Sequence, residues 1–230
     1  PHAPRSNPAL DYGAIPDAED DPTWWRRVRH TKKWPYVDAD GVVVATVYRF
    51  EHPRSGKKAI RPWNGKFWEA PEGDRPLLYL DEVTRGNAPI VLVEGEKCAD
   101  ALREAGYTAT TMMGGAQALS KTDFTPLEGR DVILWRDNDQ AGKSWQDKMV
   151  DTLREIGAAS VREVPAKALK GKPEKWDAAD ADEAERKRLV GIALKERPVV
   201  TGKAVLRLSE CGIEQFQGQA PERKYLVQEV

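Results

Sequence analysis

Short apolar segments alternate with helical segments from Pro89 onward, and this alternation restricts the possible folds more than any other feature. The apolar segments are PIVLVEG (89–95), YTATTM (107–112), DVILW (131–135) and SVREV (160–164). Continuous apolar runs of this kind are typical of strands that are buried on both faces. When such strands alternate with helices, they pair in parallel and the helices cover both faces of the sheet. We therefore predict an α/β domain with a four-stranded parallel sheet flanked by helices.

The segments between these strands carry helix signals. A helix is expected from Glu96 to Glu104, and a glycine turn into a short helix is expected at GGAQALS (114–120). A longer helix is expected after DVILW, because apolar residues recur there with helical spacing and Gly157 provides a stop. These apolar residues are Ala141, Trp145, Met149, Leu153 and Ile156.

The part of the chain before Pro89 has a different pattern. GVVVATVYRF (41–50) is rich in β-branched and aromatic residues, and glycines at positions 41, 56, 65 and 73 predict turns. We predict a small, mainly antiparallel sheet within residues 34–80. Residues 1–22 are rich in proline, aspartate and alanine and have little periodic apolar content, so we interpret them as a linker or arm.

The composition argues against several classes of protein. The chain has 230 residues, enough for a buried core, and a net charge of −1, so any surface for nucleic acid must be local. We expect neither a membrane span nor a signal peptide, because no apolar run has the required length or position. The chain begins at Pro1 rather than at a methionine, and we interpret it as a piece of a longer protein.

Cysteine and histidine residues are few and widely spaced. The two cysteines, Cys98 and Cys211, and the three histidines form no CxxC or HxxxH pattern. We therefore expect no zinc ribbon, no bound zinc and no disulfide framework, and we expect a reducing, cytoplasmic setting. Cys98 is expected to contribute to packing rather than to redox chemistry.

Acidic residues follow three of the predicted strands. In open α/β sheets, ligands bind beyond the carboxyl ends of the strands, so these residues are expected at one edge. Carboxylates placed together raise one another's pKa, and a hard divalent cation such as Mg²⁺ removes that conflict. The alternative is that they are solvated turn residues or helix caps. The acidic residues are Glu94, Asp137, Asp139, Asp177 and Asp180.

Four motifs carry a resemblance to a known family. They are VLVEGEKCADAL, TMMGGAQAL, ILWRDNDQAG and KWDAADA, in this order. In order and spacing they resemble the motifs of the Toprim fold, and they are most similar to the Toprim domains of phage and prophage primases, which are often fused to a replicative helicase. The upstream stretch from GVVVATVYRF to PLLYLDEV resembles the small subdomain that precedes Toprim in those primases. The resemblance covers about residues 34 to 195.

The resemblance implies a DNA primase, a metal-dependent nucleotidyltransferase that joins nucleoside triphosphates into short primers on single-stranded DNA. It implies that Glu94, Asp137 and Asp139 hold catalytic Mg²⁺ or Mn²⁺ and that Asp177 and Asp180 complete the site. The cations would clamp the triphosphate, assist the attacking 3′-hydroxyl and stabilise charge at the α-phosphate.

Other positions of the motifs receive roles from the same resemblance. Glu94 is also placed to act as a general base, although the metal role ranks higher. Lys97 of EGEK is expected to face phosphate oxygens as a point charge, the alternative being a solvated lysine in the first turn of a helix. Gly95 and Gly142 are expected to let the loop and the helix approach metal-bound phosphates.

The sequence departs from the family pattern at two motifs. WRDND has Trp135 and Arg136 where the pattern carries smaller residues or proline, and KWDAAD is a looser form of the last acidic motif. Toprim domains without catalytic activity occur in helicase-fused proteins. A non-catalytic DNA-binding module of a helicase and a Toprim nuclease therefore stay as alternatives.

A basic and aromatic stretch within the small subdomain is the expected surface for the template. Cations that follow the phosphate backbone, together with aromatic platforms, are what single-strand binding uses. The alternative is that the aromatic residues form a core and the cations a solvated face, and the same alternative applies to WWRRVRHTKK (24–33). The candidate residues for nucleic-acid binding are Arg49, Arg54, Lys57, Lys58, Arg61, Trp63 and Lys66.

The expected domain organisation follows from these assignments. The tail APERKYLVQEV resembles the segment that enters a RecA-like helicase domain, and the chain itself has no GxxxxGK[ST] motif. A helicase domain is thus expected as a partner, single-stranded DNA and nucleoside triphosphates as ligands, and a bacterial or phage-infected cell as the setting. The expected parts are an arm or linker (1–33), a template-binding subdomain (34–88), a Toprim catalytic domain (89–197) and a linker towards the helicase domain (198–230).

Overall fold

Four parallel strands form the centre of the larger domain. The computed structural model describes residues 15–201, apart from the side chains of residues 116, 117 and 201. The strands follow the order β5–β4–β6–β7, and all three neighbouring pairs are parallel, which confirms the predicted four-stranded parallel sheet. Their bounds are Ile90–Val93 (β4), Thr108–Thr110 (β5), Asp131–Trp135 (β6) and Ser160–Glu163 (β7).

A fifth strand, which the sequence analysis did not predict, extends this sheet. β8 (Val200–Thr201) pairs antiparallel with β7 at the edge, so part of the segment assigned to the linker belongs to the sheet. The assigned linker continues through residues 202–230, which lie outside the described residues.

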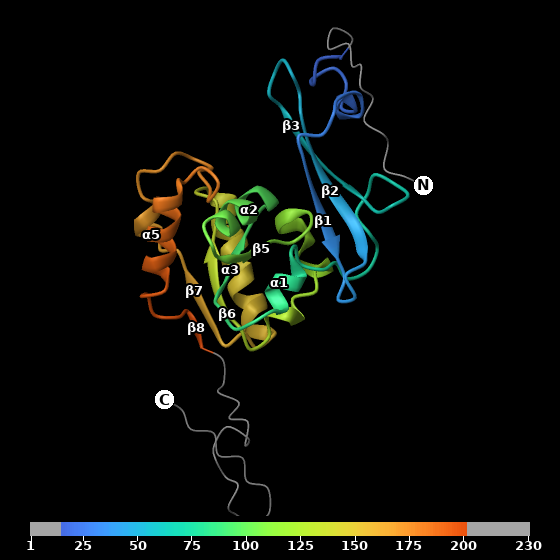
Figure 1. Cartoon of the computed structure of the whole chain (residues 1–230). Coiled ribbons are helices and arrows are strands. Elements are labelled where there is room, and N and C mark those ends of the chain that lie inside the picture. Colours follow the sequence, from blue (N-terminus) through green and yellow to red (C-terminus); the bar gives the residue numbers. More distant parts are fainter. Residues whose placement is uncertain (1–14, 202–230) are drawn as a thin grey trace, which may run out of the picture.

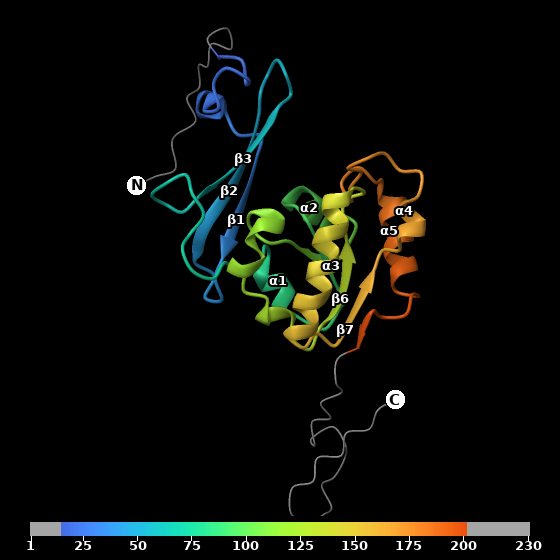
Figure 2. The ribbon, with the colours of Figure 1, turned by 180° about the vertical axis from the view of Figure 1, so that it is seen from behind.

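Helices cover both faces of the parallel sheet (Figures 1 and 2). Alternate residues of β4 point to opposite sides, so Ile90 and Leu92 pack with α3 while Val91 and Val93 pack with α2 and α5. α3 buries Trp145 and Met149 as its periodicity predicts. The helix bounds are Leu80–Thr84 (α1), Glu96–Glu104 (α2), Gln140–Glu155 (α3), Ala166–Leu169 (α4) and Glu183–Ala193 (α5).

The segment after β5 differs from the expected short α-helix. Residues 115–121 form a 3-10 helix, η3 (Gly115–Lys121), and a second 3-10 helix, η4 (Thr125–Leu127), follows it. Gly114 and Gly115 have positive φ angles of 93° and 61°, a conformation that glycine adopts without a steric penalty. The predicted glycine turn is therefore present, and it leads into the tighter type of helix.

The small subdomain is a three-stranded antiparallel sheet, as predicted. Its strands are β1 (Lys32–Val37), β2 (Val43–Glu51) and β3 (Lys58–Trp63), in the order β1–β2–β3. Figures 1 and 2 show this sheet beside the larger domain, on the side opposite α5.

One face of the small sheet packs on the larger domain. Trp34 and Tyr36 of β1 and Val47 of β2 belong to the same buried cluster as Val91 and Leu102. The two parts therefore share a hydrophobic core across their boundary.

The opposite face of the small sheet buries an aromatic cluster. Tyr48 and Phe50 of β2 pack with Trp24 and Trp25, which lie in a 3-10 helix, η2 (Trp24–Arg27), and with Ile15. Residues 1–33 were predicted to form an arm or linker. Residues 1–14 lie outside the described residues, whereas buried residues between 15 and 28 cover this face.

Within residues 15–201, no helix is both long enough and apolar enough to cross a membrane.

Candidate functional site

The acids that follow β4 and β6 lie side by side, because these two strands are neighbours in parallel register. Val93 pairs with Trp135, so Glu94 and Asp137 leave the sheet at the same edge. The Asp137 backbone amide donates a hydrogen bond to Glu94 Oε1 at 2.8 Å. Asp139 caps α3, since its Oδ1 accepts a hydrogen bond from the Gly142 amide at 2.7 Å. The three residues of the predicted central set are thus brought together.

Asp177 and Asp180 form a turn that faces the first turn of α2. Asp177 Oδ1 accepts hydrogen bonds from the amides of Ala179 (2.8 Å) and Asp180 (3.1 Å), and Asp180 Oδ2 accepts one from the Asp177 amide (3.2 Å). Lys97 Nζ of α2 lies 3.4 Å from Asp180 Oδ1 and 3.8 Å from Asp177 Oδ1. Lys97 is therefore ion-paired at the site, which differs from a free solvated lysine. We call the five carboxylates of Glu94, Asp137, Asp139, Asp177 and Asp180 the acidic edge.

The carboxylates of the acidic edge act on one another electrostatically. Burial raises the pKa of Asp137 from 3.8 to about 7, and the charges of Glu94, Asp177, Asp139 and Asp180 contribute to this rise. Burial also raises the pKa of Glu94; the hydrogen bond from Asp137 opposes this rise, and the charge of Asp139 adds to it. An arrangement of oxygen ligands with mutual repulsion fits a hard divalent cation, which takes carboxylate ligands and removes the repulsion.

Two side chains that sequence reasoning left without a role hold the Asp137–Asp139 loop in place. Arg136 Nη1 donates to the carbonyl oxygens of Asp137 (2.8 Å) and Asp139 (3.4 Å). Asn138 Nδ2 donates to the carbonyl oxygens of residues 172 and 173, both at 3.0 Å, and its amide donates to the Trp176 carbonyl at 2.9 Å. Asn138 thereby ties the loop to the segment that carries Asp177. In the sequence, this role of Asn138 is indicated only by its position, because its amide side chain stands between two aspartates.

Trp135, which departs from the family pattern, is part of the core under the site. Its side chain is buried, and its ring lies 6.2 Å from the ring of Trp176, just before Asp177. Trp135 and Trp176 thus pack together in the core, close in the sequence to Asp137 and Asp177.

Gly142 allows α3 to begin against the acidic edge, whereas no protein atom requires glycine at position 95, and the role predicted for Gly95 towards phosphates stays a prediction. A β-carbon on Gly142 would lie 2.4 Å from the Asp137 carbonyl oxygen and 2.7 Å from Glu94 Oε1. A β-carbon on Gly95 would have no neighbour within 4 Å, and its φ of −144° is extended backbone that any residue adopts. Of these two glycines, only Gly142 is required by the close approach of other protein atoms.

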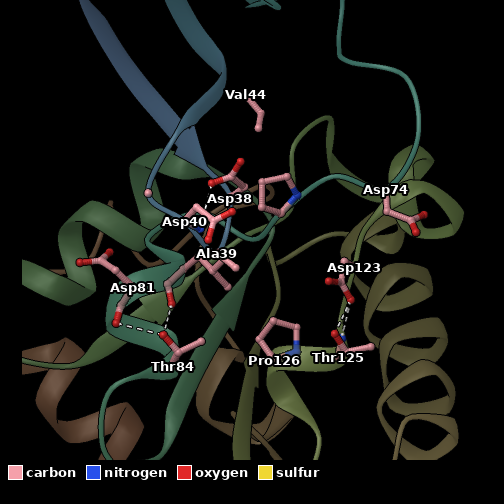
Figure 3. Close-up of a pocket in the computed structure, with 13 residues that line it drawn as sticks. Asp38, Ala39, Asp40, Val44, Asp74, Asp81, Thr84, Asp123, Thr125 and Pro126 are labelled. Atoms are coloured by element: carbon pink, nitrogen blue, oxygen red, sulfur yellow. Dashed lines mark hydrogen bonds between the residues drawn. The ribbon is translucent and has the colours of Figure 1, made fainter.

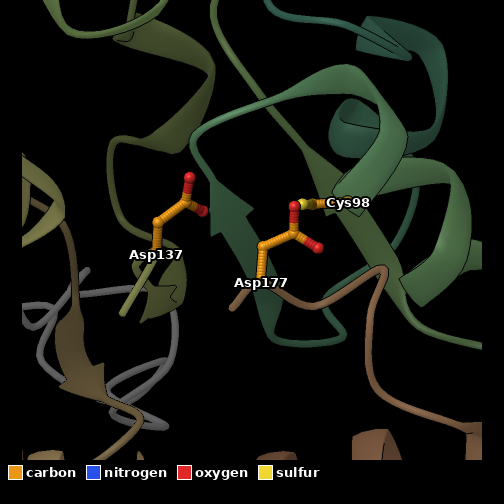
Figure 4. A group of neighbouring side chains, drawn as sticks. All are labelled: Cys98, Asp137 and Asp177. Carbon is orange, nitrogen blue, oxygen red and sulfur yellow. The ribbon is translucent and has the colours of Figure 1, made fainter. Parts of the chain in front are cut away.

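Cys98 lies at the same edge, which its spacing from other cysteines did not indicate. Its side chain is 4% exposed and belongs to the core, as the packing role predicted. Its Sγ also lies within 4.8 Å of carboxylate oxygens of Asp137 and Asp177, which are within 4.8 Å of each other (Figure 4). Burial, and then the charges of Asp177 and Asp137, raise the pKa of this thiol well above its usual range.

Arg49 and Lys58, two of the seven candidate template-binding residues, lie on the face of the small sheet that packs on the larger domain. Lys32 pairs in register with Arg49, and Lys58 pairs with Glu51, on the face that buries Trp34. Lys32 also reaches α2, where its Nζ lies 3.3 Å from Asp100 Oδ2. Glu51 lies on the same face, and its Oε1 accepts from Arg49 Nε at 2.9 Å and from Arg49 Nη2 at 2.6 Å. We call Lys32, Arg49 and Lys58 the basic sheet surface, which includes this Arg49–Glu51 pair.

Arg54 and Lys57 contact the N-terminal segment. Arg54 Nη2 lies 2.6 Å from the carbonyl oxygen of Ile15 and 2.9 Å from Asp17 Oδ1. Lys57 Nζ lies 3.1 Å from the Ala18 carbonyl oxygen. These cations have structural contacts that the sequence spacing did not predict.

The other candidates lie on or near the aromatic cluster. The Arg61 guanidinium is 5.3 Å from the Trp25 ring, and Trp63 packs against Trp68 with ring centres 5.1 Å apart. Lys66 Nζ is 4.9 Å from the ring of Phe67, which is half exposed. The aromatic residues of 24–68 therefore pack mainly on one another, which matches the alternative that they form a core.

A separate hollow of about 590 Å³ lies between the β1–β2 turn, α1 and η4 (Figure 3). None of its lining residues belongs to the acidic edge, and no basic side chain is among them. Its charge repels phosphate, so we do not assign it to nucleotide or template. The carboxylates that line it are those of Asp38, Asp40, Asp74, Asp81 and Asp123.

The fold is similar to that of bacterial primase catalytic cores. No protein-family model matches the sequence, and no curated protein matches it. The E. coli primase catalytic core is 20% identical with a TM-score of 0.51, and the match covers 75% of this chain and 54% of that one. A DNA primase domain from Pseudomonas aeruginosa gives the same identity and TM-score, over 75% of this chain and 52% of that one. The chain thus spans about half the length of these structures, and the likeness shows the Toprim-type fold.

Replacing Gly142 with alanine is expected to lower the free energy of unfolding. The added methyl group has no space between the Asp137 carbonyl and the Glu94 carboxylate, and overpacking of this kind costs about 1–3 kcal/mol. Chemical denaturation measures the change.

Gly191→Ala is the matched control, because this glycine lies inside α5 and its β-carbon would have no neighbour within 4 Å. Alanine is favoured over glycine in a helix by about 1 kcal/mol, so this variant should be equally or more stable. Equal effects of the two substitutions would refute the close approach at Gly142.

The pH dependence of stability provides a second prediction, in the presence of a chelator. The folded chain holds the Asp137 proton up to a pH of about 7, while the unfolded chain releases it near 3.8. Folded protein therefore binds more protons between these values, and stability falls as the pH rises through this window. Asp137→Asn should lose this part of the decline and gain stability relative to wild type at pH 8.

Asp151→Asn serves as the control, because Asp151 is an exposed residue of α3 that pairs with Arg154. The test measures the unfolding free energies of wild type and both variants at pH 5 and at pH 8. If Asp137→Asn and wild type lose the same stability between these pH values, the burial of the Asp137 charge is not as described.

Proposed function

We propose that the chain is the catalytic core of a DNA primase, which joins nucleoside triphosphates into primers on a single-stranded DNA template. The observation that carries the proposal is the acidic edge, where carboxylates from three loops meet beside Lys97 at the carboxyl ends of a Toprim-type sheet. The likeness to primase catalytic cores supports the fold on which this assignment rests.

The acidic edge is the proposed place for Mg²⁺ or Mn²⁺. Bound there, the cations supply the positive charge that stabilises a reacting α-phosphate and its leaving pyrophosphate. Glu94, Asp137 and Asp139 are the proposed central ligands. Asp139 uses Oδ1 to cap α3, so Oδ2 is the atom that we assign to the cation. Asp177 and Asp180 complete the site from the facing turn.

Lys97 and Glu94 have further roles in the proposal. Lys97 bridges the acidic edge to incoming phosphates, because its ammonium group lies against Asp177 and Asp180 and carries the positive charge nearest to them. Glu94 keeps one oxygen on the Asp137 amide, which fixes its position, and this supports a ligand role ahead of a general-base role.

The basic sheet surface is the proposed path for the template. It continues the face of the small sheet that packs on α2, and Lys32 contacts Asp100 of that helix, which also carries Lys97. Phosphates that follow Lys32, Arg49 and Lys58 would therefore lead towards the acidic edge. Template binding by the other five candidates stays a prediction, because their side chains contact the N-terminal segment or aromatic rings of the small subdomain. These candidates are Arg54, Lys57, Arg61, Trp63 and Lys66.

The wider context is also part of the proposal. We infer that the chain comes from a phage or prophage primase linked to a helicase, on the resemblance of its motifs. The four parts of the chain belong to the same inference, with two boundaries moved. Residues 15–33 join the template-binding subdomain, because they supply part of its aromatic cluster and the start of β1. The catalytic domain extends to Thr201, because β8 pairs with β7.

Primer synthesis is the experiment that tests the proposal. Single-stranded DNA, labelled nucleoside triphosphates and Mg²⁺ or Mn²⁺ should give labelled oligomers with the wild-type chain. Glu94→Gln and Asp137→Asn should each lower the rate at least about a hundredfold, because each removes a ligand from cations worth several kcal/mol in charge stabilisation. Asp151→Asn is the matched control and should act like wild type.

Other outcomes select the alternatives. Metal-dependent degradation of the DNA would indicate a nuclease, and DNA binding without synthesis or degradation would indicate a non-catalytic module. Synthesis that survives Asp137→Asn would contradict the assignment of the acidic edge.

The template path predicts a change in the salt dependence of DNA binding. Lys58→Ala should weaken binding of single-stranded DNA and reduce the slope of log K against log salt by about 0.7, the value for one lost phosphate contact. Lys195→Ala, just beyond the end of α5, removes the same charge away from the path and should change neither quantity. Fluorescence anisotropy over a range of salt concentrations measures both. An equal effect of the two variants would exclude this path.

A further inference from the structure

A thiol lies among the carboxylates of the acidic edge. Cys98 is in the first turn of α2, where its amide donates to the Gly95 carbonyl oxygen at 3.0 Å. Figure 4 shows its Sγ directed towards the carboxylate of Asp177, with the Asp137 carboxylate on the other side of Asp177. One donor atom from each of the three residues lies within 4.8 Å of the other two.

We propose that Cys98, Asp137 and Asp177 form a site for a thiophilic divalent cation, and that zinc is the ion it takes. The site overlaps the oxygen-only site for Mg²⁺ or Mn²⁺ through the two aspartates. It does not depend on the proposed primase activity, because it concerns binding alone. It revises the expectation of no bound zinc, which considered only cysteine and histidine spacing along the sequence.

The chemistry of the donor set selects zinc over magnesium. Zinc binds sulfur as well as carboxylate oxygen, in tetrahedral sites that use three protein ligands and leave a fourth position open. Magnesium requires oxygen ligands in octahedral geometry and gains little from a thiolate. The bond lengths of zinc put its ligand atoms about 3.5 Å apart. The three donor atoms lie within 4.8 Å of one another, so each pair must approach by at most about 1.3 Å.

The three ligands come from segments that the fold already holds. Asp177 is fixed by the amides of Ala179 and Asp180, and the Asp137 loop is tied to the same segment through Asn138. Cys98 is fixed by the start of α2 and by burial in the core. A contraction of the size required therefore needs small movements of ordered side chains rather than folding of a new segment.

A divalent ion at this site would offset part of the negative charge of the acidic edge. On binding, the Cys98 thiol loses its proton to solvent and a sulfur–zinc bond forms, which leaves one thiolate and two carboxylates around a doubly charged ion. These three ligands and the ion carry a net charge of −1, and Lys97, whose Nζ lies 3.8 Å from Asp177 Oδ1 and 3.4 Å from Asp180 Oδ1, is the cation beside them. Because zinc would occupy Asp137 and Asp177, it would compete with Mg²⁺ or Mn²⁺ for the acidic edge.

Cobalt substitution tests the site directly. The experiment uses the full chain with Cys211→Ser, so that Cys98 is its one thiol. Added Co²⁺ should produce the near-ultraviolet absorption of a thiolate–cobalt bond together with the visible bands of a tetrahedral ion, and Zn²⁺ should displace it. Cys98→Ser in the same background should lack the near-ultraviolet band and bind Zn²⁺ at least about tenfold more weakly, as measured against a chromogenic chelator.

Asp177→Asn keeps the thiol and should weaken Zn²⁺ binding while retaining the sulfur band, which separates a three-ligand site from a lone cysteine. Circular dichroism and the unfolding transition of each variant establish that it folds, and Cys98→Ala replaces Cys98→Ser if the serine variant does not. No sulfur band in the parent chain, or a band that survives loss of Cys98, would overturn the proposal. Neither readout uses DNA or nucleotide, so failure of primer synthesis and failure of this site are distinguishable.

Discussion

The hydrogen bond from the Asp137 amide to the Glu94 carboxylate is the contact on which the candidate site depends. It joins the two central strands at their carboxyl ends and fixes both acids at the edge. α3 can begin against this pair only because Gly142 has no side chain there, and Asp139 then caps the same helix. This arrangement buries carboxylates that repel one another, which destabilises the fold, and a bound cation would remove that repulsion.

Helix α2 connects this edge to the small sheet. On one side, buried Tyr36 donates to Glu96 Oε1 at 3.0 Å, and Trp34 Nε1 donates to Asp100 Oδ2 at 2.8 Å. On the other side, the same helix presents Lys97 and Cys98 to the acidic edge. These contacts of α2, together with the shared hydrophobic core, hold the two parts of the chain against each other. The basic sheet surface and the acidic edge therefore both lie next to α2.

Local patterns predicted much of this arrangement. Apolar runs gave the parallel strands and periodicity gave α2 and α3, because each signal arises within one segment. The acidic edge was also predictable, since parallel strands bring their carboxyl ends to one side. Contacts between distant segments were not predictable. Asn138 contacts backbone at residues 172 and 173, and Trp25 packs on Phe50 and Trp68 rather than serving as an exposed platform. Cys98 acquires its neighbours only through the fold.

A titration with Mn²⁺ measures whether the acidic edge binds a divalent cation. Electron paramagnetic resonance detects free Mn²⁺ through the signal of its hydrated ion, which falls as the ion binds protein. We expect saturable binding of Mn²⁺ by the wild-type chain, and we expect Glu94→Gln to weaken this binding at least about tenfold. A wild-type chain that leaves the free Mn²⁺ signal unchanged, or a Glu94→Gln variant that binds Mn²⁺ equally well, would contradict this expectation.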